Sequence, residues 1–177
     1  MYYGQIMKAD TANGKGMRVS LFVSGCTNHC EGCFQPETWN FTYGRPYTGE
    51  TEDFIINEVS KSYYAGLTIL GGEPFESENQ EEVASLVERM RRDAADKNIW
   101  IYTGNVYDRD LIPGGKRYIE GVTDRILDNI DILVDGPFVK EQKNISLNFR
   151  GSENQRIIDM RETRKTGSIV LSKLNNY

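Results

Sequence analysis

The sequence predicts an α/β fold built as a partial (β/α) barrel around a parallel sheet. Short apolar runs alternate with longer stretches of helical period, the pattern of successive β/α units. The apolar runs that we expect to form parallel strands are 18–23, 67–70, 99–102 and 132–134. At 177 residues the chain is shorter than the roughly 250 residues of a complete eight-fold barrel, so any barrel is partial. We expect a single domain over residues 1–177.

Two segments between these strands have the periodicity of amphipathic helices. Residues 51–64 carry acidic side chains in the first turn, where the helix dipole favours anions. Residues 77–95 begin with Ser77 and Gln80, which are spaced as a capping box. The apolar side chains that we expect to face the core are Phe54, Ile55, Val59 and Tyr63 in the first helix and Val83, Leu86, Val87 and Met90 in the second.

Each predicted strand is followed by a polar turn or loop. The carboxyl ends of parallel strands lie at one edge of a sheet, and α/β proteins bind their ligands outside that edge. Four features at these ends are therefore expected to face one common site: the cysteine loop after residue 23, Glu73, Thr103 and Asp135.

The three cysteines of the chain, Cys26, Cys30 and Cys33, lie directly after the first predicted strand. A [4Fe–4S] cluster is usually held by four thiolates, so three of them leave one iron open for a substrate or small molecule. The residues between the cysteines include short ones that suit a loop wrapped around a metal core: Thr27, Asn28 and Gly32. The spacing therefore indicates an iron–sulfur cluster with one open iron.

Two other uses of the cysteines stay open at this point. A structural zinc ion needs four ligands, and the sole histidine, His29, lies directly beside Cys30, where it is poorly placed to share its metal. Disulfides would leave one cysteine over and would need an oxidising compartment. Residues 1–6 are too polar for a signal peptide, so we expect a reducing, cytoplasmic location.

The charge balance excludes some classes of partner. The chain has 21 basic and 26 acidic residues, a formal net charge of -5, and no long basic run, which argues against binding to nucleic acid or to an anionic membrane surface. No stretch approaches the roughly 20 apolar residues of a membrane span. We therefore expect proteins and small molecules as partners.

A second motif, Gly71-Gly72-Glu73-Pro74, follows the predicted strand 67–70. Two residues without a Cβ allow a ligand to approach the backbone, the proline stiffens the turn, and Glu73 offers a carboxylate to an ammonium group. Taken alone, the motif is also compatible with an ordinary strand-to-helix turn that carries a solvated glutamate.

Together the two motifs resemble those of the radical S-adenosylmethionine superfamily, because residues 26–34 have the C-x3-C-x2-C-aromatic form beside Gly-Gly-Glu-Pro. Within that superfamily the chain resembles the anaerobic ribonucleotide reductase activating proteins, through the segments 13–18, 22–26, 36–39, 133–138 and 149–155. The resemblance covers residues 2 to about 158, and it implies a partial barrel of the radical S-adenosylmethionine type. Residues 159–177 match nothing in it and form a C-terminal extension without an assigned role.

The resemblance implies a set of site residues. Cys26, Cys30 and Cys33 would ligate the [4Fe–4S] cluster, whose fourth iron would be chelated by the methionine moiety of S-adenosylmethionine. The residues that would contact this cofactor are Gly32, Cys33, Phe34, Gly72, Glu73 and Thr103, with Gly72 and Glu73 at its amino group and Phe34 near the adenine. Asp135 occupies a further strand-end position that the resemblance places near the pocket.

The resemblance also implies a reaction. A one-electron donor such as flavodoxin would reduce the cluster, and S-adenosylmethionine would be cleaved to methionine and a 5′-deoxyadenosyl radical. That radical would abstract hydrogen from a glycine of the anaerobic ribonucleoside-triphosphate reductase. Two alternatives stay open: a radical enzyme with a different target, such as pyruvate formate-lyase or a small molecule, and a non-catalytic iron–sulfur protein for electron transfer or scaffolding.

Overall fold

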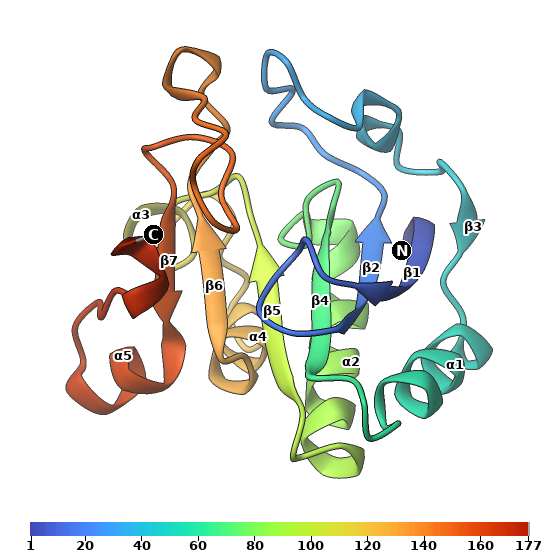
Figure 1. The fold of residues 1–177 in the computed structure, drawn as a ribbon. Coiled ribbons are helices and arrows are strands. Elements are labelled where there is room, and N and C mark those ends of the chain that lie inside the picture. Colours follow the sequence, from blue (N-terminus) through green and yellow to red (C-terminus); the bar gives the residue numbers. More distant parts are fainter. Residues whose placement is uncertain (177) are drawn as a thin grey trace.

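The computed structural model describes residues 1–176 and shows a seven-stranded sheet with α2 and α4 packed behind it (Figure 1). The strands are β1 (Tyr2–Asp10), β2 (Arg18–Val23), β3 (Arg45–Pro46), β4 (Gly66–Gly71), β5 (Asn98–Tyr102), β6 (Ile132–Asp135) and β7 (Arg156–Asp159). The α-helices are α1 (Gly49–Val59), α2 (Ser77–Asp93), α3 (Tyr107–Asp110), α4 (Thr123–Asn129) and α5 (Met160–Thr166). Short 3₁₀ turns lie at η1 (Pro36–Trp39), η2 (Lys140–Gln142) and η3 (Lys173–Asn176).

The four strands predicted from apolar runs form the parallel centre of the sheet. The strand order is β3-β1-β2-β4-β5-β6-β7, and the pairs β2–β4, β4–β5 and β5–β6 are parallel. The sheet is open, since β3 and β7 are its edges, so the predicted partial barrel is confirmed. The carboxyl ends of the four parallel strands share the upper edge of the sheet in Figure 1.

The antiparallel strands were not predicted. β1 pairs with β2, β3 pairs with β1, and β7 pairs with β6. Most of β1 is only half-buried and its register with β2 is interrupted twice, so it lacks the regular alternation that identifies a strand in a sequence. β3 and β7 are two and four residues long, too short to give a periodic signal.

Helix α1 begins and ends earlier than expected. Thr48 is its N-cap and forms a capping box with Thr51, and the helix ends at Val59. Ile55 and Val59 are buried as predicted, but Phe54 is 42% exposed and Tyr63 is 56% exposed. Tyr63 lies beyond the helix end, so helical periodicity does not apply to it, and Ile56 takes the buried position instead of Phe54.

Helix α2 confirms the predicted apolar stripe but not the predicted cap. Its four stripe residues Val83, Leu86, Val87 and Met90 are fully buried. Ser77 is the first helical residue and Glu76 is the N-cap, so the capping box of Ser77 and Gln80 is wrong. The Gln80 amide instead donates to the Phe75 and Arg117 carbonyls, because this side chain is buried between segments and not free to cap the helix.

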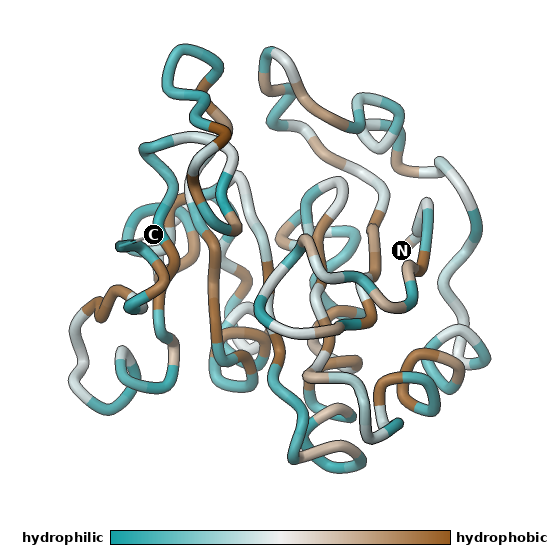
Figure 2. Tube along the Cα trace, viewed as in Figure 1, coloured by the Kyte–Doolittle hydropathy of each residue, from teal (hydrophilic) through white to brown (hydrophobic). Residues whose placement is uncertain are grey.

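The main hydrophobic core lies between the sheet and its helices. It runs from Val19 in β2 to Met160 at the start of α5. A smaller cluster on the other face contains Trp100, Val134 and Ile157, with the half-buried Phe149 and Leu174 packed against it. In Figure 2 β6 and the middle of β5 are brown, the colour of hydrophobic residues, and much of the chain in the loops at both edges is hydrophilic.

The C-terminal segment packs onto this core. Met160 is buried in the main cluster, Leu174 packs against the smaller one, and Asn175 exchanges hydrogen bonds with the backbone of Ile157. Tyr177, the last residue of the predicted extension, lies outside the described residues. No helix within residues 1–176 is long and apolar enough to cross a membrane.

Gly66 provides a test of the β4–β5 contact. A Cβ at this position would lie 1.9 Å from the Asn98 carbonyl oxygen, so the two strands would have to separate. We expect Gly66→Ala to lower the free energy of unfolding by about 1–3 kcal/mol in urea denaturation. Gly49→Ala is the matched control, because open space surrounds that Cβ and alanine favours the helix. Equal stability of the two variants would contradict the close approach.

Candidate metal centre

The cysteine loop begins where β2 ends, and its first residues are hydrogen-bonded to η1. The Gly25 amide donates to the Thr38 carbonyl at 2.7 Å, and the Cys26 amide donates to the Trp39 carbonyl at 3.4 Å. Gly32 has a φ of 76°, the left-handed conformation expected from the sequence. The two hydrogen bonds join the start of the cysteine loop to η1, which follows it in the chain.

All three cysteines are free thiols. Cys26 is buried, whereas Cys30 and Cys33 are half-buried. Burial raises the pKa of the Cys26 thiol to about 11 and also raises the pKa of the Cys30 thiol, although backbone amides oppose both shifts. The backbone amides of Asn28 and His29 lower the pKa of Cys26, and the Phe138 amide lowers the pKa of Cys30, so these amides favour the thiolate form.

These amides fit the thiolates of an iron–sulfur cluster, in which hydrogen bonds to sulfur are a means of tuning the potential. Within residues 1–176, no group of three or more histidine, cysteine, aspartate or glutamate side chains is gathered for a single metal ion. A cluster does not require such convergence, because each thiolate binds a different iron. Three free thiols on one loop, with amides that favour the thiolate form of two of them, fit a cluster with three protein ligands.

Main-chain bonds join the cysteine loop to the Gly-Gly-Glu-Pro turn. The Gly72 amide donates to the Val23 carbonyl at 2.7 Å, and the Glu73 amide donates to the Gly25 carbonyl at 2.8 Å. A Cβ on Gly72 would lie 2.6 Å from the Gly25 carbonyl oxygen, so only glycine allows this approach. The two motifs, distant in sequence, thus form one structural unit.

The Glu73 carboxylate is completely buried at the centre of this unit. One oxygen accepts from the Phe75 amide at 2.9 Å and from the Thr103 hydroxyl at 2.8 Å. The other accepts from the Gly104 amide at 2.8 Å and from the Asn28 side chain at 3.1 Å. Burial raises the pKa of Glu73, and the donated hydrogen bonds oppose that shift. The carboxylate therefore connects the cysteine loop, its own turn and the end of β5.

The structure brings Thr103 to Glu73 but separates Asp135 from it. Both Asp135 oxygens bind Arg156, at 2.9 and 2.5 Å, and one of them also accepts from the Tyr107 amide. Asp135 is thus at the predicted edge of the sheet, but its carboxylate is used to join β6, β7 and α3. The arginine partner lies 21 residues away on an unpredicted strand.

Phe34 extends from the cysteine loop into solvent. Its side chain is 72% exposed, and its ring centroid lies 5.7 Å from that of Phe138. The Lys143 ammonium group lies 5.6 Å from the Phe34 ring centroid. The connection between β6 and β7 therefore packs beside the cysteine loop, a contact that no local sequence pattern predicts.

A buried ion pair lies between the cysteine loop and the start of α2. The sequence did not predict this pair. Both oxygens of Glu76 bind Arg117, at 2.5 and 2.8 Å, and one of them accepts from the amide and the hydroxyl of Thr27. Glu76 is almost fully buried. The two charged residues are 41 positions apart, so no local pattern could reveal the pair.

Two buried side-chain oxygens near this edge of the sheet have no hydrogen-bond partner among the described residues. One belongs to Asn105, which follows β5. The other belongs to Asn154, whose amide donates to the Pro137 carbonyl just after β6. Buried polar atoms are normally paired, so these two oxygens are exceptions in the described structure.

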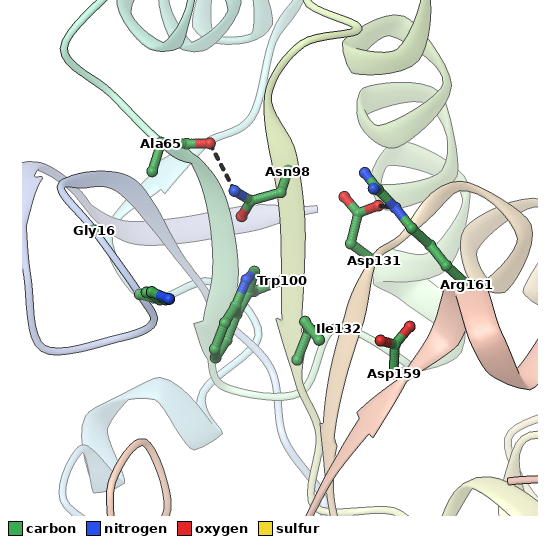
Figure 3. Close-up of a pocket in the computed structure, with 9 residues that line it drawn as sticks. Gly16, Ala65, Asn98, Trp100, Asp131, Ile132, Asp159 and Arg161 are labelled. Atoms are coloured by element: carbon green, nitrogen blue, oxygen red, sulfur yellow. Dashed lines mark hydrogen bonds and ion pairs between the residues drawn. The ribbon is translucent and has the colours of Figure 1, made fainter. Parts of the chain in front are cut away.

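A pocket of about 460 Å³ lies at the opposite end of the strands (Figure 3). Its lining residues are Lys15, Gly16, Ala65, Asn98, Trp100, Asp131, Ile132, Asp159 and Arg161. Within it, Asn98 bonds to the Ala65 carbonyl and Arg161 pairs with Asp131. This pocket contains none of the predicted site residues, which lie at the other edge of the sheet.

The raised pKa of Cys26 predicts an unusual alkylation profile. In the metal-free protein, reaction of Cys26 with iodoacetamide should increase about tenfold per pH unit from pH 7 to 10 without a plateau, because only the thiolate reacts. The same peptide in denaturant should level off above about pH 8.5. Peptide mass spectrometry measures both rates, and a plateau near pH 9 in the folded protein would contradict the described burial.

The Glu76–Arg117 pair predicts a large stability difference from a surface pair. Arg117→Ala leaves a buried carboxylate without its cation and should lower the free energy of unfolding by about 3–5 kcal/mol. Arg125→Ala is the control, because Arg125 binds Glu88 through two bonds but both side chains are partly exposed, and the loss should be about 0–1 kcal/mol. Similar losses in urea denaturation would show that Glu76 is solvated.

Comparisons with known proteins agree with this site. A family model described as a 4Fe-4S single cluster domain matches residues 12–158. The anaerobic ribonucleoside-triphosphate reductase-activating protein of Escherichia coli (strain K12) is 36% identical over 163 residues, which are 91% of this chain and 100% of the relative. The proteins of the same name from Haemophilus influenzae and Enterobacteria phage T4 are 39% and 37% identical, over 88% and 89% of this chain and 96% and 93% of the relatives. The chain therefore belongs to the family of anaerobic ribonucleoside-triphosphate reductase-activating proteins, with a 4Fe–4S domain of the radical S-adenosylmethionine type.

Proposed function

We propose that this protein activates an anaerobic ribonucleoside-triphosphate reductase by producing a glycyl radical on it. The main observation in support of this proposal is that the two motifs lie together. The loop with three free thiols is hydrogen-bonded to the Gly-Gly-Glu-Pro turn through the Asn28 side chain and through main-chain amides. The reductase is the proposed target because the relatives of this chain are named as reductase-activating proteins.

The cysteine loop would hold the cluster, with Cys26, Cys30 and Cys33 each on one iron. When bound, the cluster and S-adenosylmethionine supply a one-electron cleavage of the sulfonium, which yields the 5′-deoxyadenosyl radical for hydrogen abstraction. Amides from the loop and from Phe138 stabilise the thiolate form of Cys26 and Cys30.

The neighbouring turn would bind S-adenosylmethionine. The predicted contacts are Gly32, Cys33, Phe34, Gly72, Glu73 and Thr103. Because both Glu73 oxygens already accept two hydrogen bonds each, we propose that its charge acts on the methionine ammonium group from within the turn, while the Gly72 backbone forms the approach surface. Thr103 then acts through Glu73, whose carboxylate it holds in place.

The protein also needs an electron donor and a reducing environment for this reaction. Reduced flavodoxin is the proposed one-electron donor, and the free thiols accord with a cytoplasmic, reducing location. One main hydrophobic core connects β2 with the start of α5, which supports a single functional domain. The net charge of -5 gives no support for nucleic acid as a partner, and no helix within residues 1–176 gives support for a membrane span.

The test is anaerobic reconstitution with iron and sulfide, followed by reduction and addition of S-adenosylmethionine and the reductase. We expect a glycyl-radical doublet by electron paramagnetic resonance, together with 5′-deoxyadenosine. Cys26→Ala should lose both signals, because two thiolates remain for the cluster, while its far-ultraviolet circular dichroism stays that of the wild type.

The outcomes separate the candidate functions. Cleavage of S-adenosylmethionine without a doublet on the reductase would overturn the choice of target and favour another glycyl radical enzyme, such as pyruvate formate-lyase, or a small molecule. An intact cluster with neither product would favour electron transfer or a scaffold role. Full activity of Cys26→Ala would remove this residue from the ligand set.

A further inference from the structure

We infer that residues 138–153, the outer part of the connection from β6 to β7, form the docking element for the reductase, with Ile145 as its apolar anchor. The inference rests on the proposed function, because it concerns how the target protein reaches the cysteine loop. It assigns the contact to a segment that neither motif includes.

Residues 138–153 lie at the edge of the sheet that the target must approach. In Figure 1 the orange connection between β6 and β7 and the blue cysteine loop both project from the upper edge of the sheet. Hydrogen abstraction from a glycine requires the target backbone to approach that edge closely. Whatever protein is the target must therefore cover the side chains that project beside the cysteines.

Ile145 is the most exposed large hydrophobic side chain among the described residues, at 92%. A single exposed apolar residue is normal on a protein surface, so exposure alone decides nothing. Here, however, the second most exposed such residue, Phe34 at 72%, lies on the adjoining loop. The two most exposed large apolar side chains thus project from the same edge of the sheet.

The backbone around Ile145 is held without any help from its side chain. The Asn144 side chain accepts from the Ser146 amide at 2.9 Å and donates to Glu153 at 3.0 Å. Two main-chain bonds join the two sides of the segment: the Asn144 amide donates to the Gly151 carbonyl, and the Glu153 amide donates to the Gln142 carbonyl. A preformed loop loses little conformational freedom on binding, which suits a docking element.

The base of the same segment contacts the cysteine loop. Lys140 forms an ion pair with Glu31 at 2.6 Å, and the Phe138 ring packs against that of Phe34. A partner that binds at the tip is thereby placed at a fixed distance from the cysteines. The proposed binding partner of Ile145 is an apolar pocket on the reductase, beside the glycine-bearing loop of that protein.

The experiment compares Ile145→Asp with Leu171→Asp in the reconstituted protein. Leu171 is also an exposed aliphatic residue, at 52%, but it lies in the C-terminal segment that pairs with Ile158. We expect Ile145→Asp to weaken binding to the reductase at least tenfold and to reduce the glycyl-radical doublet accordingly. Ile145→Val should stay within about threefold of the wild type, since it keeps most of the apolar surface.

Iron content and reductase-free formation of 5′-deoxyadenosine should be unchanged in all three variants. Loss of that reductase-free reaction in Ile145→Asp would place Ile145 in the cofactor site and overturn the docking role. Equal binding of Ile145→Asp and wild type, or equal weakening by Leu171→Asp, would also overturn it. If the wild-type protein itself produces no doublet on the reductase, the proposed function fails, and this result is distinct from a failure of the inference.

Discussion

The buried carboxylate of Glu73 is the interaction on which the organisation of the site depends. It receives four hydrogen bonds from three segments, the cysteine loop, its own turn and the end of β5. An unpaired buried donor costs about 1–3 kcal/mol, so the loss of this one acceptor would weaken all three segments together. The Arg117–Glu76 ion pair, whose glutamate lies three residues after Glu73, also helps to hold the cysteine loop in place.

These fastenings explain how a half-open sheet can position a reactive loop. The parallel strands bring the segments to one edge, but strand geometry alone leaves each loop free to move. In a closed barrel, adjoining strands would hold these loops in position. Here hydrogen bonds between the loops serve that purpose. The site is thus buried and hydrogen-bonded at its base, around Glu73, and exposed at its rim, around Phe34.

The sequence was most informative where one periodic signal was enough. The four parallel strands and the buried stripe of α2 were predicted from apolar patterns alone, since burial on a face leaves a direct trace in the residue order. Phe54 and Tyr63 were placed wrongly because a helix pattern does not say which apolar residues lie at the rim or beyond the end. Glu76, Arg117 and the Asp135–Arg156 pair could not be predicted, because ion pairs distant in sequence have no period.

The packing of Phe138 against Phe34 also has a consequence for biosynthesis. The two loops that it joins are distant in sequence, and the nearby Lys140–Glu31 pair spans 109 residues. On the ribosome, the three thiols emerge well before β6 and the segment that follows it. The cysteine loop can adopt its described surroundings only after these later residues have been translated, so a cluster inserted earlier would lack the cover of this segment.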